Sequence, residues 1–160
     1  MFRNLPPITM NLLIINVICF FADYVFERYG VSFSRLFGLH YIAAADFHFW
    51  QPLTYMFMHA NFSHLFFNMF AVFMFAPAIE ECWGSKRYLI YYLVTGIGAG
   101  VIQEVVWALQ LQPVLNSVDP MLASALANRV VTIGASGAVF GILLAFGWLF
   151  PDVRMFIMFI

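Results

Sequence analysis

Long apolar runs with very few charges set the first limit on what this chain can fold into. Four such runs cover residues 8–26, 62–79, 88–106 and 130–150. A helix rises about 1.5 Å per residue, so each run is roughly long enough to cross the ~30 Å hydrocarbon layer of a bilayer. Of the 160 residues, 64% are hydrophobic and only 9% are charged, which is unlike a soluble domain. The sequence therefore predicts an all-α, multi-pass integral membrane protein with one domain over residues 1–160.

The segments between and after these runs complete the expected architecture. Residues 111–128 contain two prolines and are expected to be a loop with a short surface helix over 121–127. The last apolar run, 155–160, would cover only ~9 Å as a helix, which suggests a chain truncated at the start of a fifth span. Residues 29–58 are too mixed to span, and their aromatic and histidine side chains are typical of a segment in the headgroup region: His40, Tyr41, Phe47, Phe49, Trp50, Tyr55 and Phe57.

The charged and sulfur-containing residues indicate an orientation and exclude some functions. A net charge of −1 and the lack of a basic run argue against nucleic acid as a partner. Cys19 and Cys82 have no metal-ligand spacing, so neither a metal nor another cofactor is predicted. A cytoplasmic N-terminus, in a cell (inner or plasma) membrane, would place four of the seven basic residues inside: Arg3, Lys86, Arg87 and Arg154.

A serine near the polar end of the fourth run is the candidate nucleophile. Ser136 stands between Gly134 and Gly137. Small residues follow at steps of three and four, so one helix face would have no bulk and another backbone could approach closely: Gly134, Ala138, Gly141 and Ala145. A serine in lipid can also simply bond to a carbonyl one turn earlier, so the residue type alone does not establish catalysis.

His64 and Asn68 are the polar residues best placed to act with this serine. They are four residues apart and therefore lie on one face of the second run, near its outer end. Such groups in a span are either functional or bonded to another helix. His64 could be the base that activates Ser136, or both side chains could donate hydrogen bonds to a developing oxyanion. The spacing does not choose between these roles.

Three motifs, in this order, resemble those of the rhomboid intramembrane serine proteases. The second-helix region of that family is similar to residues 50–69, which read WQPLTYMFMHANFSHLFFNM. The family's Glu-x-x-x-Gly turn matches Glu80-Glu-Cys-Trp-Gly84, and its nucleophile motif matches Gly134-Ala-Ser136-Gly137 with Gly141. The resemblance implies a rhomboid-like helical bundle with an interfacial first loop. It also implies a serine endopeptidase that cleaves transmembrane segments of protein substrates within the lipid bilayer, without cofactors.

The resemblance further implies a role for each site residue. In rhomboids the serine works with a histidine on a later helix. The histidine and asparagine that match His64 and Asn68 instead form an oxyanion hole with the backbone N–H of the serine. Carried over, Ser136 is the nucleophile, and His64 and Asn68 stabilise the tetrahedral intermediate. The remaining residues near the site are expected to be structural: Gly134, Gly137, Gly141 and His59.

Two departures from the family pattern bear on activity. Gln51 stands where the family commonly has arginine, so a charge-mediated tie of the first loop is expected to be missing. The family's catalytic histidine lies on its sixth helix, whereas every histidine here precedes Ser136: His40, His48, His59 and His64. A neutral serine hydroxyl needs a partner that removes its proton. The 160 residues by themselves are therefore expected to be inactive.

Two other readings remain open at this point. A non-catalytic rhomboid-like protein that binds transmembrane clients would share the architecture, although it would not need Ser136, His64 and Asn68. A transporter or channel could explain Glu104 and the glycines of the third run, but it gives no reason for the serine and histidine motifs. The substrate and the oligomeric state are left undetermined.

Overall fold

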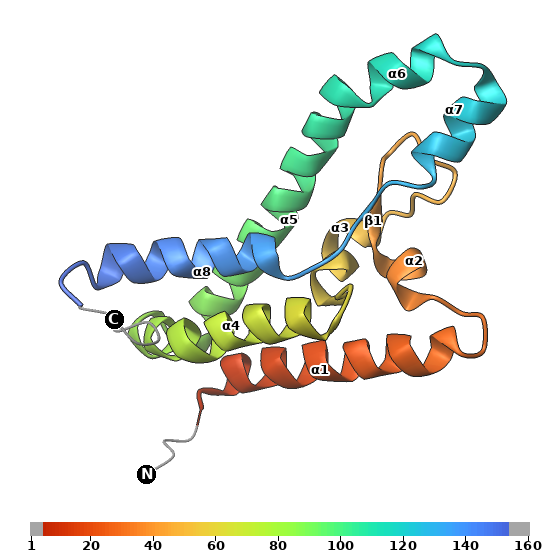
Figure 1. Ribbon diagram of the computed structural model, residues 1–160. Coiled ribbons are helices and arrows are strands. Elements are labelled where there is room, and N and C mark those ends of the chain that lie inside the picture. The colour runs from red at the N-terminus through yellow and green to blue at the C-terminus, as the bar shows by residue number, and fades with distance from the viewer. Residues whose placement is uncertain (1–4, 154–160) are drawn as a thin grey trace.

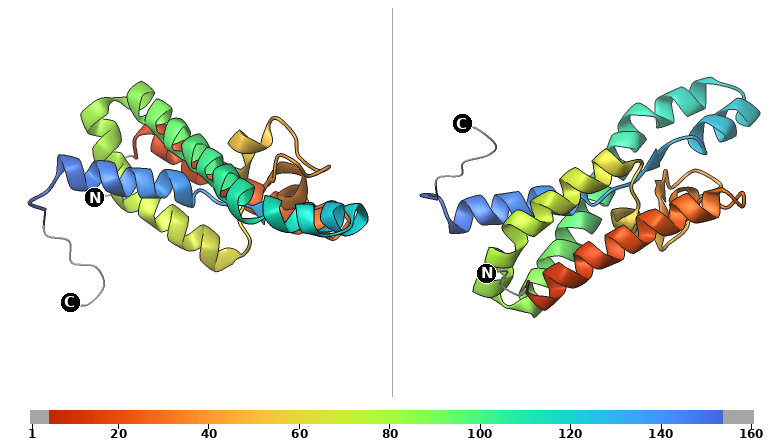
Figure 2. Two further views of the ribbon diagram at one scale, coloured as in Figure 1. Left: turned by 90° about the horizontal axis from the view of Figure 1, so that it is seen from above. Right: turned by 60° about the horizontal axis from the view of Figure 1, so that its bottom comes forward.

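The computed structural model describes residues 5–153, so the final apolar run, Arg3 and Arg154 lie outside the described part. Four longer helices form its body: α1 (Pro7–Glu27), α4 (Phe62–Trp83), α5 (Ser85–Gln110) and α8 (Ser136–Leu149). α4 lies between α1 and α8, while α5 crosses them and packs against α8 (Figure 1, Figure 2). The shorter elements are α2 (Phe33–Phe37), β1 (Leu39–His40), α3 (Gln51–Thr54), the 3₁₀ helix η1 (Tyr55–Phe57), α6 (Gln112–Ser117), α7 (Pro120–Ala127) and β2 (Val131–Thr132).

Three stretches among the described residues are long and apolar enough to cross a membrane: α1, α4 and Ser85–Ser117. The mostly helical chain is an integral membrane protein. The fourth expected run, 130–150, differs from the prediction, because α8 begins only at Ser136 and has 14 residues. The preceding residues are extended: β2 pairs antiparallel with β1, and Gly134 takes a φ of 128°. These pairings keep residues 130–135 out of the helix.

The region between the third and fourth runs is also more helical than expected. α5 continues to Gln110, and the predicted loop 111–128 contains both α6 and α7. Pro113 and Pro120 occupy the first two positions of these helices, where the missing N–H would have no partner anyway. Asp119 caps α7, since its Oδ1 accepts hydrogen bonds from the backbone N–H groups of Met121 and Leu122 at 2.9 and 3.1 Å.

The aromatic segment packs partly inside the protein. His40 is fully buried, and Tyr41 and Tyr55 are each 3% exposed. The Tyr55 hydroxyl donates to the carbonyl oxygen of Gly96 on α5 at 2.6 Å. Phe49, in contrast, is 85% exposed. The segment therefore holds the helices together from one end, while Phe49 presents an exposed ring suited to an interface.

Two contacts fix the helices that carry the candidate site. The buried Glu80 carboxylate of α4 accepts from the backbone N–H groups of Ile8 and Thr9 at 3.0 and 2.7 Å and from the Thr9 hydroxyl at 2.7 Å, so it caps the start of α1. Gly141 of α8 lies against Thr95 of α5, where an added Cβ would come within 2.7–2.8 Å of the threonine side chain. The close helix approach expected from the small residues therefore occurs between α5 and α8.

Candidate active site

Ser136 is the exposed first residue of α8, and the first loop holds the segment in front of it. In the β1–β2 pair, Leu39 faces Thr132 and His40 faces Val131. The backbone N–H of Gly134 then donates to the carbonyl oxygen of Tyr55 at 2.9 Å. Ser136 thus lies where the extended residues 131–134 lead into α8. That extended segment is hydrogen-bonded to β1 and to Tyr55.

The imidazole of His64 and the hydroxyl of Ser136 both lie beside Gly134. A Cβ on Gly134 would come within 2.7 Å of both Cε1 and Nε2 of His64, and within 3.8 Å of the Ser136 Oγ. Any side chain there would displace the histidine, and the φ of 128° already disfavours other residues. The structure therefore places His64 and Ser136 on the same glycine, Gly134. Only a residue without a side chain leaves room for the imidazole at this position.

The hydrogen bonds of His64 indicate which ring nitrogen carries its proton. The backbone N–H of Ala60 donates to Nδ1 at 3.4 Å, so in a neutral ring the proton belongs on Nε2, the atom beside Gly134. The N-terminal turn of α4 is fixed as well, because the Asn61 side chain caps it by accepting from the His64 backbone N–H at 2.8 Å. In this tautomer His64 presents a hydrogen-bond donor beside Gly134.

Asn68 lies one turn farther along α4 and is 6% exposed. Its Nδ2 donates to the His64 carbonyl oxygen at 3.0 Å, which uses one of its two N–H groups. The other N–H remains for a group bound on the same helix face. Asn68 is thus placed beside His64, and its bond to the backbone of α4 fixes its side chain.

His59 supports His64 from the loop before α4. Their rings pack edge to face, with centroids 5.1 Å apart and an angle of 66°. Burial, followed by the neighbouring His64, lowers the pKa of His59 to about 4, and the Phe57 backbone offsets this only in part. His59 is therefore neutral near pH 7. Its contact with the Phe57 backbone falls short of a full hydrogen bond, so packing against His64 and burial mainly hold this ring.

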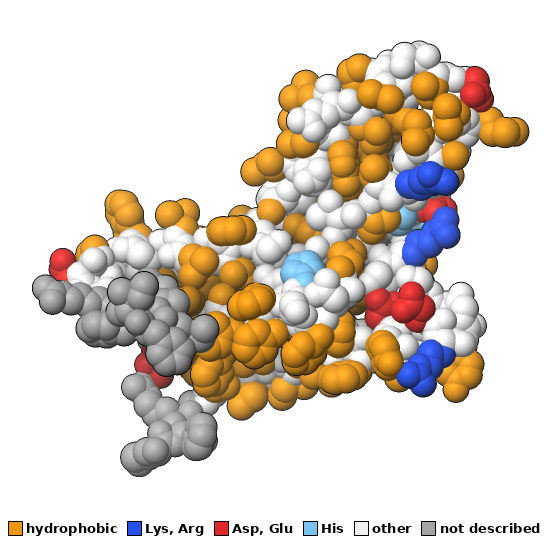
Figure 3. All heavy atoms as spheres, viewed as in Figure 1, with side chains coloured by type: hydrophobic (Ala, Val, Ile, Leu, Met, Phe, Trp, Pro, Cys, Tyr) orange, Lys and Arg blue, Asp and Glu red, His pale blue; other side chains and the backbone are white. Residues whose placement is uncertain are grey.

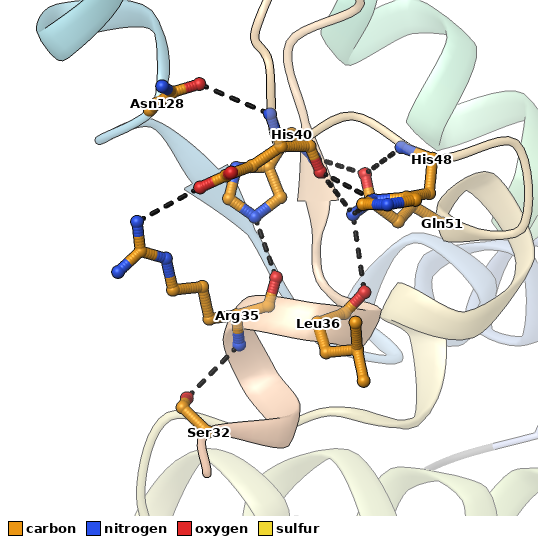
Figure 4. A network of polar contacts seen from close by, with 8 residues as sticks. Ser32, Arg35, Leu36, His40, His48, Gln51 and Asn128 are labelled. Carbon is orange, nitrogen blue, oxygen red and sulfur yellow. Dashed lines mark hydrogen bonds and ion pairs between the residues drawn. The ribbon is translucent and has the colours of Figure 1, made fainter. Parts of the chain in front are cut away.

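Gln51 ties the first loop together, which the sequence did not predict (Figure 4). This fully buried side chain donates through Nε2 to the carbonyl oxygens of Asp46 and Leu36 at 2.9 and 3.3 Å. Its Oε1 accepts from the backbone N–H groups of His48 and His40 at 3.1 and 3.3 Å. The sequence predicted that the first loop would lack the charged contacts of an arginine at this position. The neutral amide of Gln51 compensates, because it both donates and accepts hydrogen bonds within the loop.

The Gln51 network also reaches the segment that leads to the serine. The Asp46 backbone N–H donates to Oδ1 of Asn128, just after α7, and the Asp46 carboxylate pairs with Arg35 at 3.0 Å (Figure 4). Nε2 of His40 lies 2.8 Å from the carbonyl oxygen of Arg35. His40 and His48 are thus engaged in the loop rather than at Ser136. In the described part of the chain no group of three or more metal-ligating side chains gathers.

Comparison with known proteins gives consistent matches. A family model described as Rhomboid domain matches residues 46–160. The chain is 29% identical over 139 residues to "Rhomboid protease AarA" of Providencia stuartii, covering 84% of this chain and 48% of that protein. It is 30% identical over 131 residues to "Rhomboid-like protein 11, chloroplastic" of Arabidopsis thaliana, covering 82% and 38%. With "Rhomboid protease GlpG" of Haemophilus influenzae the identity is 27% over 96 residues, covering 59% and 50%. The chain thus spans half or less of the length of these relatives.

Proposed function

Because this chain belongs to the rhomboid family, we propose that Ser136 is the nucleophile of an intramembrane serine endopeptidase that cleaves transmembrane segments of other membrane proteins. The observation that carries the proposal is that His64 Nε2 and Ser136 Oγ both lie next to Gly134. Relatives that are named rhomboid proteases support the same reaction at the level of the family.

In this mechanism the oxygen of Ser136 bonds to the carbonyl carbon of the substrate peptide, and the carbonyl oxygen becomes an oxyanion. Nε2–H of His64, the free N–H of Asn68 and the backbone N–H of Ser136 donate to that oxyanion. The serine N–H is available because the first N–H groups of a helix have no partner within it. Collapse of the intermediate breaks the C–N bond, and the amine leaves with the proton that the base took from Ser136. The remaining acyl-serine is then hydrolysed by water.

We place the general base, which removes the proton of Ser136, outside the described residues. Nε2 of His64 carries a proton in the neutral ring, so it cannot accept one from Ser136. His40 and His48 are held in the first loop, and His59 packs behind His64. We therefore assign the base to a histidine on a later helix, as the family resemblance implies, and propose that these 160 residues alone do not cleave.

The test uses a fluorophosphonate probe on the complete gene product in lipid. The probe should label Ser136, and Ser136→Ala should abolish both the labelling and the cleavage of a membrane substrate. His64→Ala and Asn68→Ala should each lower the cleavage rate by about 10²–10³-fold and leave residual activity, as loss of one oxyanion donor does. Ser63→Ala is the matched control, since Ser63 is an exposed serine near the start of α4. Its labelling and rate should equal those of the parent.

Two outcomes would overturn parts of the proposal. If the 160-residue chain cleaves a substrate and Ser136→Ala stops that cleavage, then a histidine of this chain is the base. His64 is the first candidate, and its assignment as oxyanion donor would then be wrong. If the folded complete protein binds transmembrane peptides but is neither labelled nor active, the protein is a non-catalytic binder of transmembrane clients.

A further inference from the structure

A cavity of about 650 Å³ opens beside the segment that leads to Ser136, and the proposed protease chemistry does not use it. α2 forms one wall, and the residues from the end of α7 through β2 form the other. Its polar and apolar lining includes Ser34, Arg35, Asn128, Arg129, Val131 and Ile133.

The polar groups of this cavity are mainly hydrogen-bond donors. Within residues 5–153 the guanidinium of the exposed Arg129 makes no hydrogen bond or ion pair. Asn128 turns its Oδ1 to the backbone of Asp46, so its Nδ2 is left without a partner among those residues. Arg35 pairs with Asp46 yet is 70% exposed, which leaves much of its guanidinium open to solvent. Asp46 pairs with Arg35, and the Asp23 carboxylate is already bonded by the N–H groups of Phe33 and Ser34 and by the Ser34 hydroxyl. The guanidinium of Arg129 is therefore the cationic group of the cavity that an anion could bind.

Exposed apolar side chains lie on the elements that form the cavity walls. Val31 and Leu36 line a second hollow that also includes Arg35, and they are 44% and 42% exposed. Leu122 of α7, three residues before the lining residue Ala125, is 46% exposed. In Figure 3 the visible Lys and Arg side chains lie at the end of the molecule opposite the start of α1, with Asp and Glu side chains between them and hydrophobic ones nearby. A small anion from water would need only the donors. Donors between exposed apolar surfaces fit an anion that is attached to an apolar body.

We propose that this cavity binds the phosphate of an anionic phospholipid. Arg129 and Arg35 donate to the phosphate oxygens, and the acyl chains cover the apolar side chains beside α2 and α7. Val131 and Ile133 form part of the cavity wall, whereas Ser136 does not. A bound lipid would therefore pack against the extended residues that precede Ser136 without touching the serine. The site is independent of the proposed proteolysis, because no residue in it takes part in the chemistry.

Native mass spectrometry of the 160-residue chain, released from micelles with equal phosphatidylglycerol and phosphatidylcholine of matched acyl chains, tests this proposal. The parent should retain phosphatidylglycerol preferentially. Arg129→Gln should reduce that preference about fivefold, since one basic residue near a membrane surface contributes ~1 kcal/mol. Arg28→Gln is the matched control: Arg28 is exposed and lies outside the cavity, where it bonds to the Tyr24 hydroxyl at 2.9 Å.

Further measurements test whether the cavity selects the phosphate of a lipid, free phosphate or an acidic peptide. Inorganic phosphate at millimolar concentration should displace the retained phosphatidylglycerol in part, and Ser136→Ala should leave the preference unchanged. Equal retention of both lipids by the parent would refute the proposal. An equal loss of preference in Arg28→Gln and Arg129→Gln would refute it too, because surface charge alone would then explain the selectivity. If an acidic peptide binds through Arg129 while phosphatidylglycerol shows no preference, the cavity is a protein-docking site and the lipid assignment fails.

Discussion

The carboxamide of Gln51 satisfies two carbonyl oxygens and two N–H groups at once, and no charged side chain can do both. Gln51→Arg restores the residue common in the family but removes the acceptor for the N–H groups of His40 and His48. Each buried group left unpaired costs about 1–3 kcal/mol. We expect Gln51→Arg to destabilise the protein by roughly 2–4 kcal/mol in a denaturant titration in detergent. Gln110→Arg, at an exposed position, should change stability by less than about 0.5 kcal/mol.

Unchanged stability of Gln51→Arg would mean that the first loop can rebuild its hydrogen bonds around a guanidinium. The loop would then not depend on an acceptor at this position, and the network of Figure 4 would be one of several equivalent arrangements.

His59 gives the protein a dependence on pH whose sign follows from its pKa. The folded state lowers that pKa from 6.5 to about 4, so the unfolded state binds a proton more readily. Above about pH 6.5 the ring is neutral in both states, so it does not weigh against folding. As the pH falls towards 4 the unfolded state gains a proton that the folded state does not, and the free energy of unfolding falls by about 3 kcal/mol. Thermal unfolding in detergent should show a falling melting temperature across this interval, and His59→Gln should flatten the curve. A slope that is the same in His59→Gln would assign the effect to other groups.

At the scale of elements, the α5–α8 contact leaves no room for a larger side chain. Gly141 has no space for a side chain against Thr95, and the Tyr91 hydroxyl bonds to its carbonyl oxygen at 2.9 Å. Gly141→Leu should force the two helices apart and cost about 2 kcal/mol or more. Leu143→Ile, a half-buried change of equal volume on the same helix, should cost less than about 1.5 kcal/mol. Equal melting temperatures for both variants would show that the close approach does not contribute to stability.

The same helix shows how far the sequence could be read. Its apolar run and small-residue steps predicted a tightly packed helix, but they did not place its start, since Val130 to Ala135 are as apolar as the helix itself. The start depends on pairing with β1, which is about ninety residues earlier and only two residues long, so no local periodicity marks it. Likewise the motifs identified Ser136 and His64. The hydrogen bond from the Ala60 N–H to Nδ1 of His64, and the lack of space for a side chain at Gly134, depend on the tertiary structure and could not be predicted from the motifs.

At the scale of the whole molecule, the orientation in the membrane remains a prediction. Lys86 and Arg87 follow the turn at Gly84, and the stretch Ser85–Ser117 is long enough to separate its two ends by a bilayer. In a background in which Cys19 and Cys82 are replaced by alanine, single cysteines at Ser85 and Asn116 should react with an impermeant maleimide from opposite sides. The cysteine at Ser85 should be the cytoplasmic one. Labelling of both from one side would rule out a span between them.

The Glu80 cap has a consequence for the order in which the protein is made. The N–H groups of Ile8 and Thr9 leave the ribosome 71 to 72 residues before the carboxylate that accepts from them. Until α4 enters the bilayer, the first turn of α1 can satisfy these groups only with water, so that end of α1 must stay at the membrane surface. The arrival of α4 brings the carboxylate that takes the place of that water. The first turn of α1 therefore has its full set of hydrogen bonds only after α4 has been made, which ties the completion of the first span to the synthesis of the second.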